Sequence, residues 1–258
     1  MEDEVGKPLL IRGSKKITLT EDGMLLRKRA EEVVALMEKT KAELTSSDEN
    51  ISGEIYMGSG ETEAVSTIAK VAKNLQEQYP LIRYHIYSGD AEHITERLDK
   101  GLIDFGLLVE PFDIEKYDFI RLPVKDTWGV LMRKDSPLAE KESICARDLW
   151  DKPLIISHQT SISKEMIAWL QKDISQLNIV ATYDLIYNAS RFVKMGFGYA
   201  ITLDKLINTS GDSNLCFRPL YPISEAGLCI VWKKYQVFSR VAEQFLKKIQ
   251  AEFAIDMQ

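Results

Sequence analysis

From residue 51 onward, short apolar runs with strand character alternate with amphipathic helical stretches. The first part supplies three expected strands joined by two expected helices, which in chain order span residues 53–57, 64–79, 82–87, 91–100 and 104–109. Apolar residues recur every three or four positions in the helical stretches, which is the helical period. This alternation predicts parallel βαβ units with helices on both faces of a sheet.

A second α/β set begins at Trp128. Its expected strands span residues 129–132, 153–157, 179–183, 199–202 and 216–220, and its expected helices span 162–172 and 190–195. A last strand at 227–232 and an amphipathic helix at 238–253 follow. We therefore expect two α/β lobes joined by two crossings of the chain. Lobe 1 comprises residues 51–126 together with 224–258, and lobe 2 comprises residues 127–223.

Residues 20–46 predict one long helix, which the polar run 46–50 separates from the lobes. Thr20 is the expected N-cap, and two acidic residues follow it in the first turn, where the helix dipole favours negative charge. An apolar seam repeats in alternating steps of four and three: Leu26, Ala30, Val33, Met37, Thr40 and Leu44. The helix could pack on its own domain, but a seam this narrow on a charged helix favours pairing with a second chain.

The first nineteen residues contain a basic hairpin. Two short apolar runs flank Gly13 and Ser14, and residues 5–18 carry four cations and no acidic residue. Such a patch, inside a chain of net charge −6, is suited to contact with DNA phosphates. An ordinary solvated hairpin is the other interpretation. The candidates for contact with the DNA backbone are Arg12, Lys15 and Lys16.

Composition excludes several classes of protein. The three cysteines are far apart and odd in number, so we expect reduced thiols, and the three scattered histidines argue against a histidine-built metal site. No leader-like segment and no apolar stretch of membrane-spanning length is present in the sequence. We expect a soluble, cytoplasmic protein with no metal and no cofactor. The acidic balance argues against binding of nucleic acid by the body of the chain.

Several short segments together resemble the LysR-type transcriptional regulators. Met1–Gly6, Leu9–Arg12 and Leu19–Gly23 resemble the end of that family's recognition helix, its wing and the start of its linker helix. Three successive sequence segments of its effector domain are also matched, by Leu98–Leu107, Val130–Ala139 and Val193–Ile201.

This resemblance implies a two-lobed effector domain of the type 2 periplasmic-binding-protein fold. It also implies that residues 1–19 are the remnant of a winged helix-turn-helix, with most of the recognition helix missing. The truncation would be natural or the result of a misassigned start. Residues 20–46 would be the linker helix, and two subunits would dimerise through Leu26, Ala30, Val33, Met37 and Leu44.

Candidate effector-binding residues lie where predicted strands end, which is where open α/β sheets bind ligands. They are Ser59, Gly60, Glu61, Thr62, Ser88, Gly89, Thr127, Ser157, His158 and Asn188. Each also has an ordinary interpretation: the glycine turns and Asp90 as helix caps, His158 as a solvent-facing residue and Asn188 as a turn. Asp126 and Thr127 form a candidate pair at the expected crossing between the lobes, with a strand kink as the other interpretation. Glu61 argues against a strongly anionic effector.

The sequence contains no nucleophile elbow, metal-ligand spacing or glycine fingerprint, so we expect no enzyme. The leading hypothesis is a LysR-type regulator that binds a small-molecule effector in the inter-lobe cleft. It would act as a homodimer or homotetramer and would bind promoter DNA in its full-length form. The alternatives are a truncated ligand-binding module without specific DNA binding and, less favoured, a small-molecule enzyme on the same fold.

Overall fold

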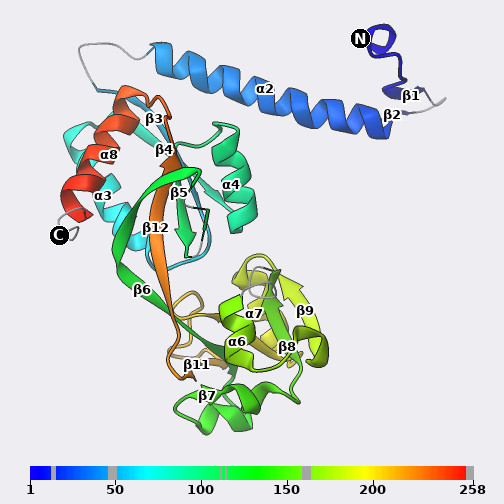
Figure 1. Cartoon of the computed structure of the whole chain (residues 1–258), viewed down its shortest axis with the longest axis vertical. Helices are drawn as coiled ribbons and strands as arrows, with labels where there is room; N and C mark the ends of the chain where they lie inside the picture. Colours follow the sequence, from blue (N-terminus) through cyan, green and yellow to red (C-terminus); the bar gives the residue numbers. More distant parts are fainter. Residues whose placement is uncertain (13–15, 46–50, 111, 114, 159–163, 254–258) are drawn as a thin grey trace.

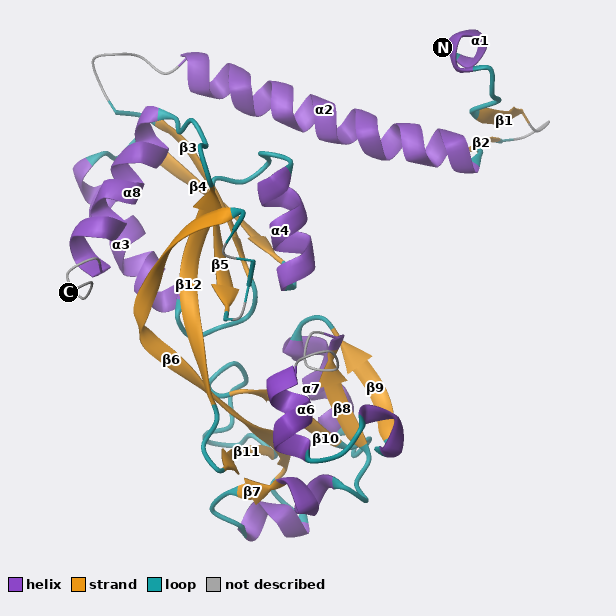
Figure 2. Cartoon of the chain, in the orientation of Figure 1, coloured by secondary structure: helices purple, strands orange, loops and turns teal. Residues whose placement is uncertain are grey.

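The chain forms an N-terminal hairpin, a long helix and two α/β lobes that are connected by two strands (Figure 1). The computed structural model describes residues 1–12, 16–45, 51–110, 112–113, 115–158 and 164–253. Helices and strands alternate through both lobes, as Figure 2 shows. The predicted mixed α/β fold with two lobes is confirmed.

The connecting strands are β6 (Tyr117–Arg133) and β12 (Glu225–Lys233). The first part of β6 pairs antiparallel with β12, from Tyr117 to Thr127. The second part pairs antiparallel with β10 (Tyr199–Leu203) and β11 (Leu215–Tyr221) in lobe 2. One strand of 17 residues is therefore shared by both lobes.

The prediction of a short strand at 129–132 was wrong in length, because β6 begins at Tyr117. In lobe 1 this strand lies at the edge of the sheet, where buried Ile120 and Leu122 alternate with exposed Arg121. Pro123 is compatible with an edge strand, since the missing amide need not join a ladder. A half-exposed strand has no continuous apolar run, so its pattern resembled a loop.

Lobe 1 contains three parallel strands, β3 (Gly53–Ser59), β4 (Ile82–Ser88) and β5 (Phe105–Val109), with β3 between the other two. Helices α3 (Val65–Gln78) and α8 (Arg240–Phe253) share one core with this sheet. Helix α4 (Ala91–Asp99) packs in a separate core with Ile103 and Val231. The predicted parallel units and the helices on both faces are confirmed here.

Lobe 2 is built on β10, which pairs in parallel with β8 (Leu154–Ser157); β8 in turn pairs in parallel with β9 (Ile179–Tyr183). The short strand β7 (Ile144–Cys145) pairs with β11. Helix α6 (Lys164–Leu170) falls within the predicted helix 162–172, whose first two residues lie outside the described part of the chain. Three short 3-10 helices, Pro137–Glu140, Ala146–Leu149 and Ile174–Gln176, complete the lobe.

Helix α7 corrects two predictions. It spans Ile186–Lys194 and so begins before the predicted start at Ser190, and Asn188 lies inside it rather than in a preceding turn. The residue at its N-cap, Leu185, makes no side-chain capping hydrogen bond. The local sequence thus lacks the polar cap that normally marks a helix start.

The N-terminal region contains a four-residue helix, α1 (Glu2–Val5), and the hairpin of β1 (Leu10–Arg12) and β2 (Ile17–Leu19). Helix α2 (Glu21–Thr45) follows. The Thr20 hydroxyl accepts a hydrogen bond from the Gly23 amide at 3.0 Å, which confirms the predicted N-cap. A side chain at position 23 would clash, because a Cβ there would lie 2.1 Å from the Leu9 carbonyl oxygen.

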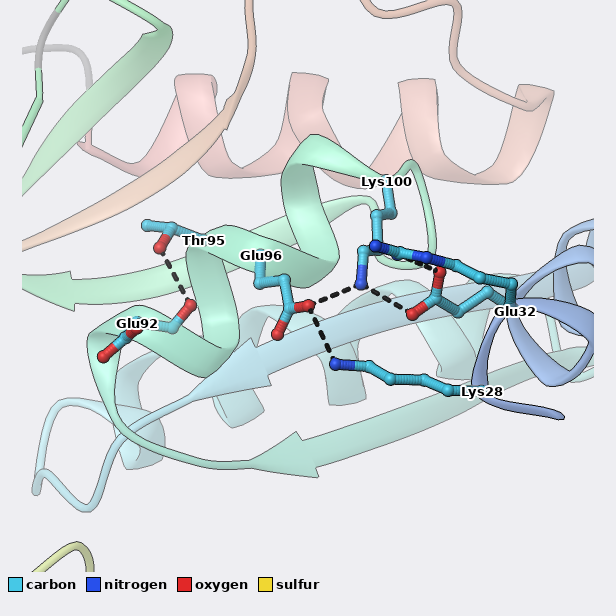
Figure 3. A network of polar contacts seen from close by, with 7 residues as sticks. Lys28, Glu32, Glu92, Thr95, Glu96 and Lys100 are labelled. Atoms are coloured by element: carbon cyan, nitrogen blue, oxygen red, sulfur yellow. Dashed lines mark hydrogen bonds and ion pairs between the residues drawn. The ribbon is translucent and has the colours of Figure 1, made fainter. Parts of the chain in front are cut away.

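Charged side chains attach α2 to lobe 1 beside α4 (Figure 3). Lys100 Nζ lies 2.7 Å from Glu32 Oε1 and also forms an ion pair with Glu96. Lys28 on α2 lies 3.7 Å from the same Glu96 carboxylate. These pairs are at least partly exposed to solvent, so each contributes little stability by itself.

A buried ion pair lies further along the same helix. Lys39 Nζ lies 2.8 Å from Asp104 Oδ1 and donates to the Gly101 carbonyl at 3.0 Å. The other oxygen of Asp104 accepts a hydrogen bond from the Tyr56 amide at 2.8 Å. The two side chains are 8% and 2% exposed, so water screens this pair weakly. Lys39 thus connects α2 to the sheet of lobe 1.

We predict that Lys39→Met destabilises the protein by about 3–5 kcal/mol, because it leaves the Asp104 carboxylate buried without its cation. The matched control is Lys28→Met on the same helix, whose exposed ion pair contributes less than about 1 kcal/mol. Urea unfolding followed by circular dichroism measures both values. Equal stability of the two variants would contradict the structural importance of the buried pair.

Candidate functional site

The loop after β3 is fixed by its own hydroxyl groups. Ser59 is the last residue of β3, and its Oγ donates to the Gly60 carbonyl at 2.7 Å. The buried Thr62 hydroxyl donates to the Asp126 carboxylate on β6 and accepts from the Ala64 amide at 3.1 Å. Thr62 therefore holds the start of α3 and ties this loop to the shared strand.

Asp126 lies where β6 leaves lobe 1, and it is buried. Burial raises the pKa of its carboxyl group, and hydrogen bonds from Thr62 and from the Glu63 backbone oppose that rise. Sequence reasoning named this residue with Thr127 as a candidate pair, with a strand kink as the other interpretation, but kept only Thr127 among the effector-binding residues. A carboxylate in a strand, directly before the predicted crossing between lobes, was the signal that could have identified it.

Glu61 connects the two lobes directly. Its carboxylate accepts a hydrogen bond from the backbone amide of Ile186, the first residue of α7. A helix N-terminus presents unpaired amides and a partial positive charge, so it favours a carboxylate. Glu61 of lobe 1 thus caps a helix of lobe 2, which explains why α7 starts without a polar residue of its own.

The end of β4 lies beside the end of β3. Ser59 and Ser88 are partners in the parallel register, and the Gly89 amide donates to the Ser59 carbonyl at 3.1 Å. Ser88 is exposed and Gly89 is partly exposed. The structure therefore brings the first six candidate residues, Ser59, Gly60, Glu61, Thr62, Ser88 and Gly89, to one edge of the lobe 1 sheet.

Asp90 caps α4, as predicted. Its carboxylate accepts from the His93 amide at 2.9 Å and lies 2.7 Å from His93 Nδ1. The hydrogen bond with Asp90 raises the pKa of His93, and the charge of Asp184 in lobe 2 adds to that rise. Burial raises the pKa of Asp90, but the hydrogen bonds from His93 outweigh it and hold that pKa below its usual value, with a smaller contribution from His158 in lobe 2. The two lobes therefore face each other here with charged side chains.

The candidates of lobe 2 gather at the matching edge. Ser157 ends β8, where it pairs with Tyr183 of β9, and His158 follows it. Asn188 is exposed in the first turn of α7, close in sequence to the amide that Glu61 caps. Thr127 lies at the crossing, where its carbonyl accepts from the Asp204 amide at 2.9 Å. Sequence reasoning missed Asp184 and Ile186, because neither belongs to a recognisable motif.

The hairpin and the seam lie elsewhere on the molecule. Lys16 is exposed, Lys15 lies outside the described residues, and the Arg12 backbone belongs to β1. Lys7 Nζ lies 2.9 Å from Asp22 at the start of α2. The seam residues Val33 and Met37 are 58% and 67% exposed, so they do not pack on the chain itself.

The described residues contain neither a cluster suited to a metal ion nor a helix suited to span a membrane. No group of three histidine, cysteine, aspartate or glutamate side chains among them could hold a metal ion. No helix in the ranges that the structure describes combines the length and apolar character needed to cross a bilayer.

Comparisons with known proteins found a family model that matches most of the chain. The family model described as "LysR substrate binding domain" matches residues 48–254. The HTH-type transcriptional regulator YfeR of Shigella flexneri is 22% identical over 244 residues, which cover 94% of this chain and 79% of YfeR.

Solved structures share the fold. The full-length CbnR in complex with its target DNA has a TM-score of 0.72 at 12% identity, over 97% of this chain and 86% of CbnR. The effector-binding domain of QuiR in complex with shikimate has a TM-score of 0.68 at 17% identity, over 80% of this chain and all of that domain. The predicted type 2 periplasmic-binding-protein fold is confirmed.

We predict that Glu61→Ala weakens the first turn of α7, because the helix loses its only identified cap among the described residues. A lost cap costs about 1 kcal/mol, which corresponds to an about fivefold faster amide exchange. Hydrogen exchange of a peptide that covers Asp184–Ser190 measures this effect. Glu63→Ala, in the same loop but exposed, is the matched control and leaves that exchange unchanged. Identical protection in the two variants would show that the contact between the lobes is not formed in solution.

Proposed function

Because the chain belongs to the LysR substrate-binding-domain family, we propose that it binds a small-molecule effector between its two lobes and controls transcription through that binding. The residues that we assign to effector contact lie at the strand ends and the helix start described above. They are Ser59, Gly60, Glu61, Thr62, Ser88, Gly89, Thr127, Ser157, His158 and Asn188. Two strand ends in lobe 1 face a strand end and a helix N-terminus in lobe 2, as is typical of ligand sites in open α/β sheets.

The single observation that carries the proposal is the hydrogen bond between Glu61 and the Ile186 amide. It joins the two candidate edges, and in it the first amide of α7 donates to a carboxylate oxygen. A ligand placed here would exchange hydrogen bonds with the same groups that hold the lobes together. Its binding energy would therefore bias the arrangement of the lobes.

The charges at the junction restrict the effector. Glu61, Asp90 and Asp184 bring negative charge to it, while His93 and His158 provide cations only when protonated. We infer a neutral or zwitterionic polar molecule, since a dianion would be repelled. The complex of the QuiR effector domain with shikimate supports a small polar molecule as the general class of ligand.

We further propose that the chain acts as a homo-oligomer through α2 and that the basic hairpin contacts DNA phosphates. The exposed side chains of Val33, Met37 and Leu44 support the first proposal. The pairing residues would be Leu26, Ala30, Val33, Met37 and Leu44. Lys28 and Lys39 dock α2 on lobe 1 through a different side of the helix. The basic hairpin with Arg12, Lys15 and Lys16, together with the complex of CbnR with target DNA, supports promoter DNA as a partner.

We expect a thermal-shift screen of small metabolites to find a stabilising ligand that depends on Ser88 and Asn188. At a hundredfold excess over its dissociation constant, one such ligand stabilises the fold by roughly 2–3 kcal/mol. Ser88→Ala and Asn188→Ala should each weaken binding, because both side chains are exposed at the junction. Ser66→Ala, which changes an exposed serine of α3, is the matched control.

Thr62→Val is a poorer test, since it would remove the donor to buried Asp126 and destabilise the unliganded protein. Hits that bind Ser88→Ala and Asn188→Ala as tightly as the unmodified protein would place the effector elsewhere.

The apolar seam of α2 can be tested as the surface through which two copies of the chain associate. Val33→Glu combined with Met37→Glu places two charges in the proposed seam, where unpaired burial is costly. Light scattering should then report a smaller species than the unmodified protein. Arg27→Gln combined with Lys41→Gln makes the same change in net charge on the same helix and should leave the mass unchanged. If both double variants keep the original mass, the seam is not the interface.

A further inference from the structure

Lobe 2 contains a hollow lined by residues other than those assigned to the junction between the lobes. It has a volume of about 430 Å³, and its lining residues are Lys134, Ala139, Thr209, Cys216, Phe217 and Arg218. This volume lies within the range of about 300–1,000 Å³ that is typical of small-molecule sites. The hollow lies beside β11, the end of β6 and the 3-10 helix Pro137–Glu140.

Sheet pairing places the two cations of this hollow. Cys216 and Arg218 are two residues apart on β11, so their side chains point to the same face. The backbone amide of Lys134 donates to the Asn214 carbonyl at 2.8 Å, which extends the β6–β11 pairing past Arg133. The Lys134 side chain therefore points to the same face of the sheet as those of Cys216 and Arg218.

Backbone carbonyls hold both cations in position. The Arg218 guanidinium donates to the Ala139 carbonyl at 2.7 and 3.1 Å and to the Phe217 carbonyl at 2.9 Å. Lys134 Nζ donates to the Gly211 carbonyl at 3.2 Å. A guanidinium has five N–H groups and an ammonium has three, so each cation keeps donors beyond these contacts.

The partners in these contacts are neutral. Among the described residues, no ion pair involves Lys134 or Arg218, and no carboxylate lines the hollow. Three other cations of lobe 2 do have an acidic partner: Arg133 pairs with Asp135, Lys141 with Asp148 and Lys152 with Asp151. Two positioned positive charges in a hollow without a counter-charge are suited to an anion.

We propose that this hollow binds a small organic carboxylate. The carboxylate would accept hydrogen bonds from Lys134 and Arg218, and the Thr209 hydroxyl offers a third donor. Ala139 supplies apolar surface for the carbon skeleton, while Phe217 contributes its backbone carbonyl, which accepts from Arg218. This ligand differs in charge from the molecule proposed for the junction, so lobe 2 would respond to a second chemical signal.

Cys216 provides a reporter inside the hollow. It is 7% exposed, and burial raises the pKa of its thiol. Cys145 is exposed, and Cys229 is buried in the core of lobe 1. Alkylation by iodoacetamide should therefore modify Cys145 quickly, Cys216 slowly and Cys229 least. A ligand in the hollow would protect Cys216 without affecting Cys145.

The test is calorimetric titration of the full chain with acetate, benzoate and citrate, at an ionic strength held constant with potassium chloride. At least one carboxylate should bind saturably and slow the alkylation of Cys216. Lys134→Gln should weaken that binding by about tenfold or more, because a charge-assisted hydrogen bond is lost. Lys194→Gln, an exposed lysine of α7, makes the same charge change and should have no effect.

Four results would overturn the proposal. The first is the absence of saturable binding by all three carboxylates. The second is binding that Lys134→Gln leaves unchanged, and the third is binding that Ser88→Ala abolishes, which would locate it at the junction. Inorganic phosphate is titrated in parallel, and tighter binding of phosphate than of every carboxylate would also contradict an organic ligand.

Discussion

The structure depends on one strand that belongs to two lobes. β6 continues without interruption from the sheet of lobe 1 into that of lobe 2, and β12 accompanies it through the crossing. The register of β6 with β12 shifts between Gly227 and Cys229, beside the point where β6 leaves lobe 1. Bulges bend and twist strands, so this is where relative motion of the lobes would be absorbed.

Polar contacts at the crossing tie the candidate site to that strand. Thr62 joins the loop after β3 to Asp126 on β6, and Glu61 in the same loop caps α7 across the junction. A single turn of chain thus contacts its own lobe, the shared strand and the other lobe. A ligand that displaced either contact would act on all three parts together.

The other end of lobe 1 is joined to α2. Lys39 of α2 forms a buried ion pair with Asp104, the residue directly before β5. Asp104 also accepts a hydrogen bond from the Tyr56 amide of β3. Since the same sheet carries the loop with Glu61 and Thr62, lobe 1 and α2 would move as one body. The proposed regulation requires only that lobe 2 change its position relative to this body.

The sequence was sufficient for elements whose signals are local. The apolar periods of α3, α4 and α8 and the N-caps Thr20 and Asp90 were read correctly, because each depends on neighbouring residues. The start of α7 could not be predicted, since its cap is Glu61, 125 positions away in the chain. Likewise, Lys39 shows no sign in sequence that its partner is Asp104.

The candidate site was predictable to a similar extent. The ends of β3 and β4 were identified from glycine turns, and the register places Ser59 beside Ser88. Asp184 and Ile186 were missed because their roles arise only when the two lobes meet, and the partner of Asp126, Thr62, lies 64 positions away in the chain. Such contacts depend on tertiary packing, and no periodicity or motif encodes them.

A crystal structure of the chain with a stabilising metabolite would test the central claim most directly. We predict that the molecule lies between the lobes, within hydrogen-bonding distance of both the loop that carries Glu61 and the first turn of α7. A molecule bound wholly within one lobe, with the hydrogen bond between Glu61 and the Ile186 amide unchanged, would contradict that claim.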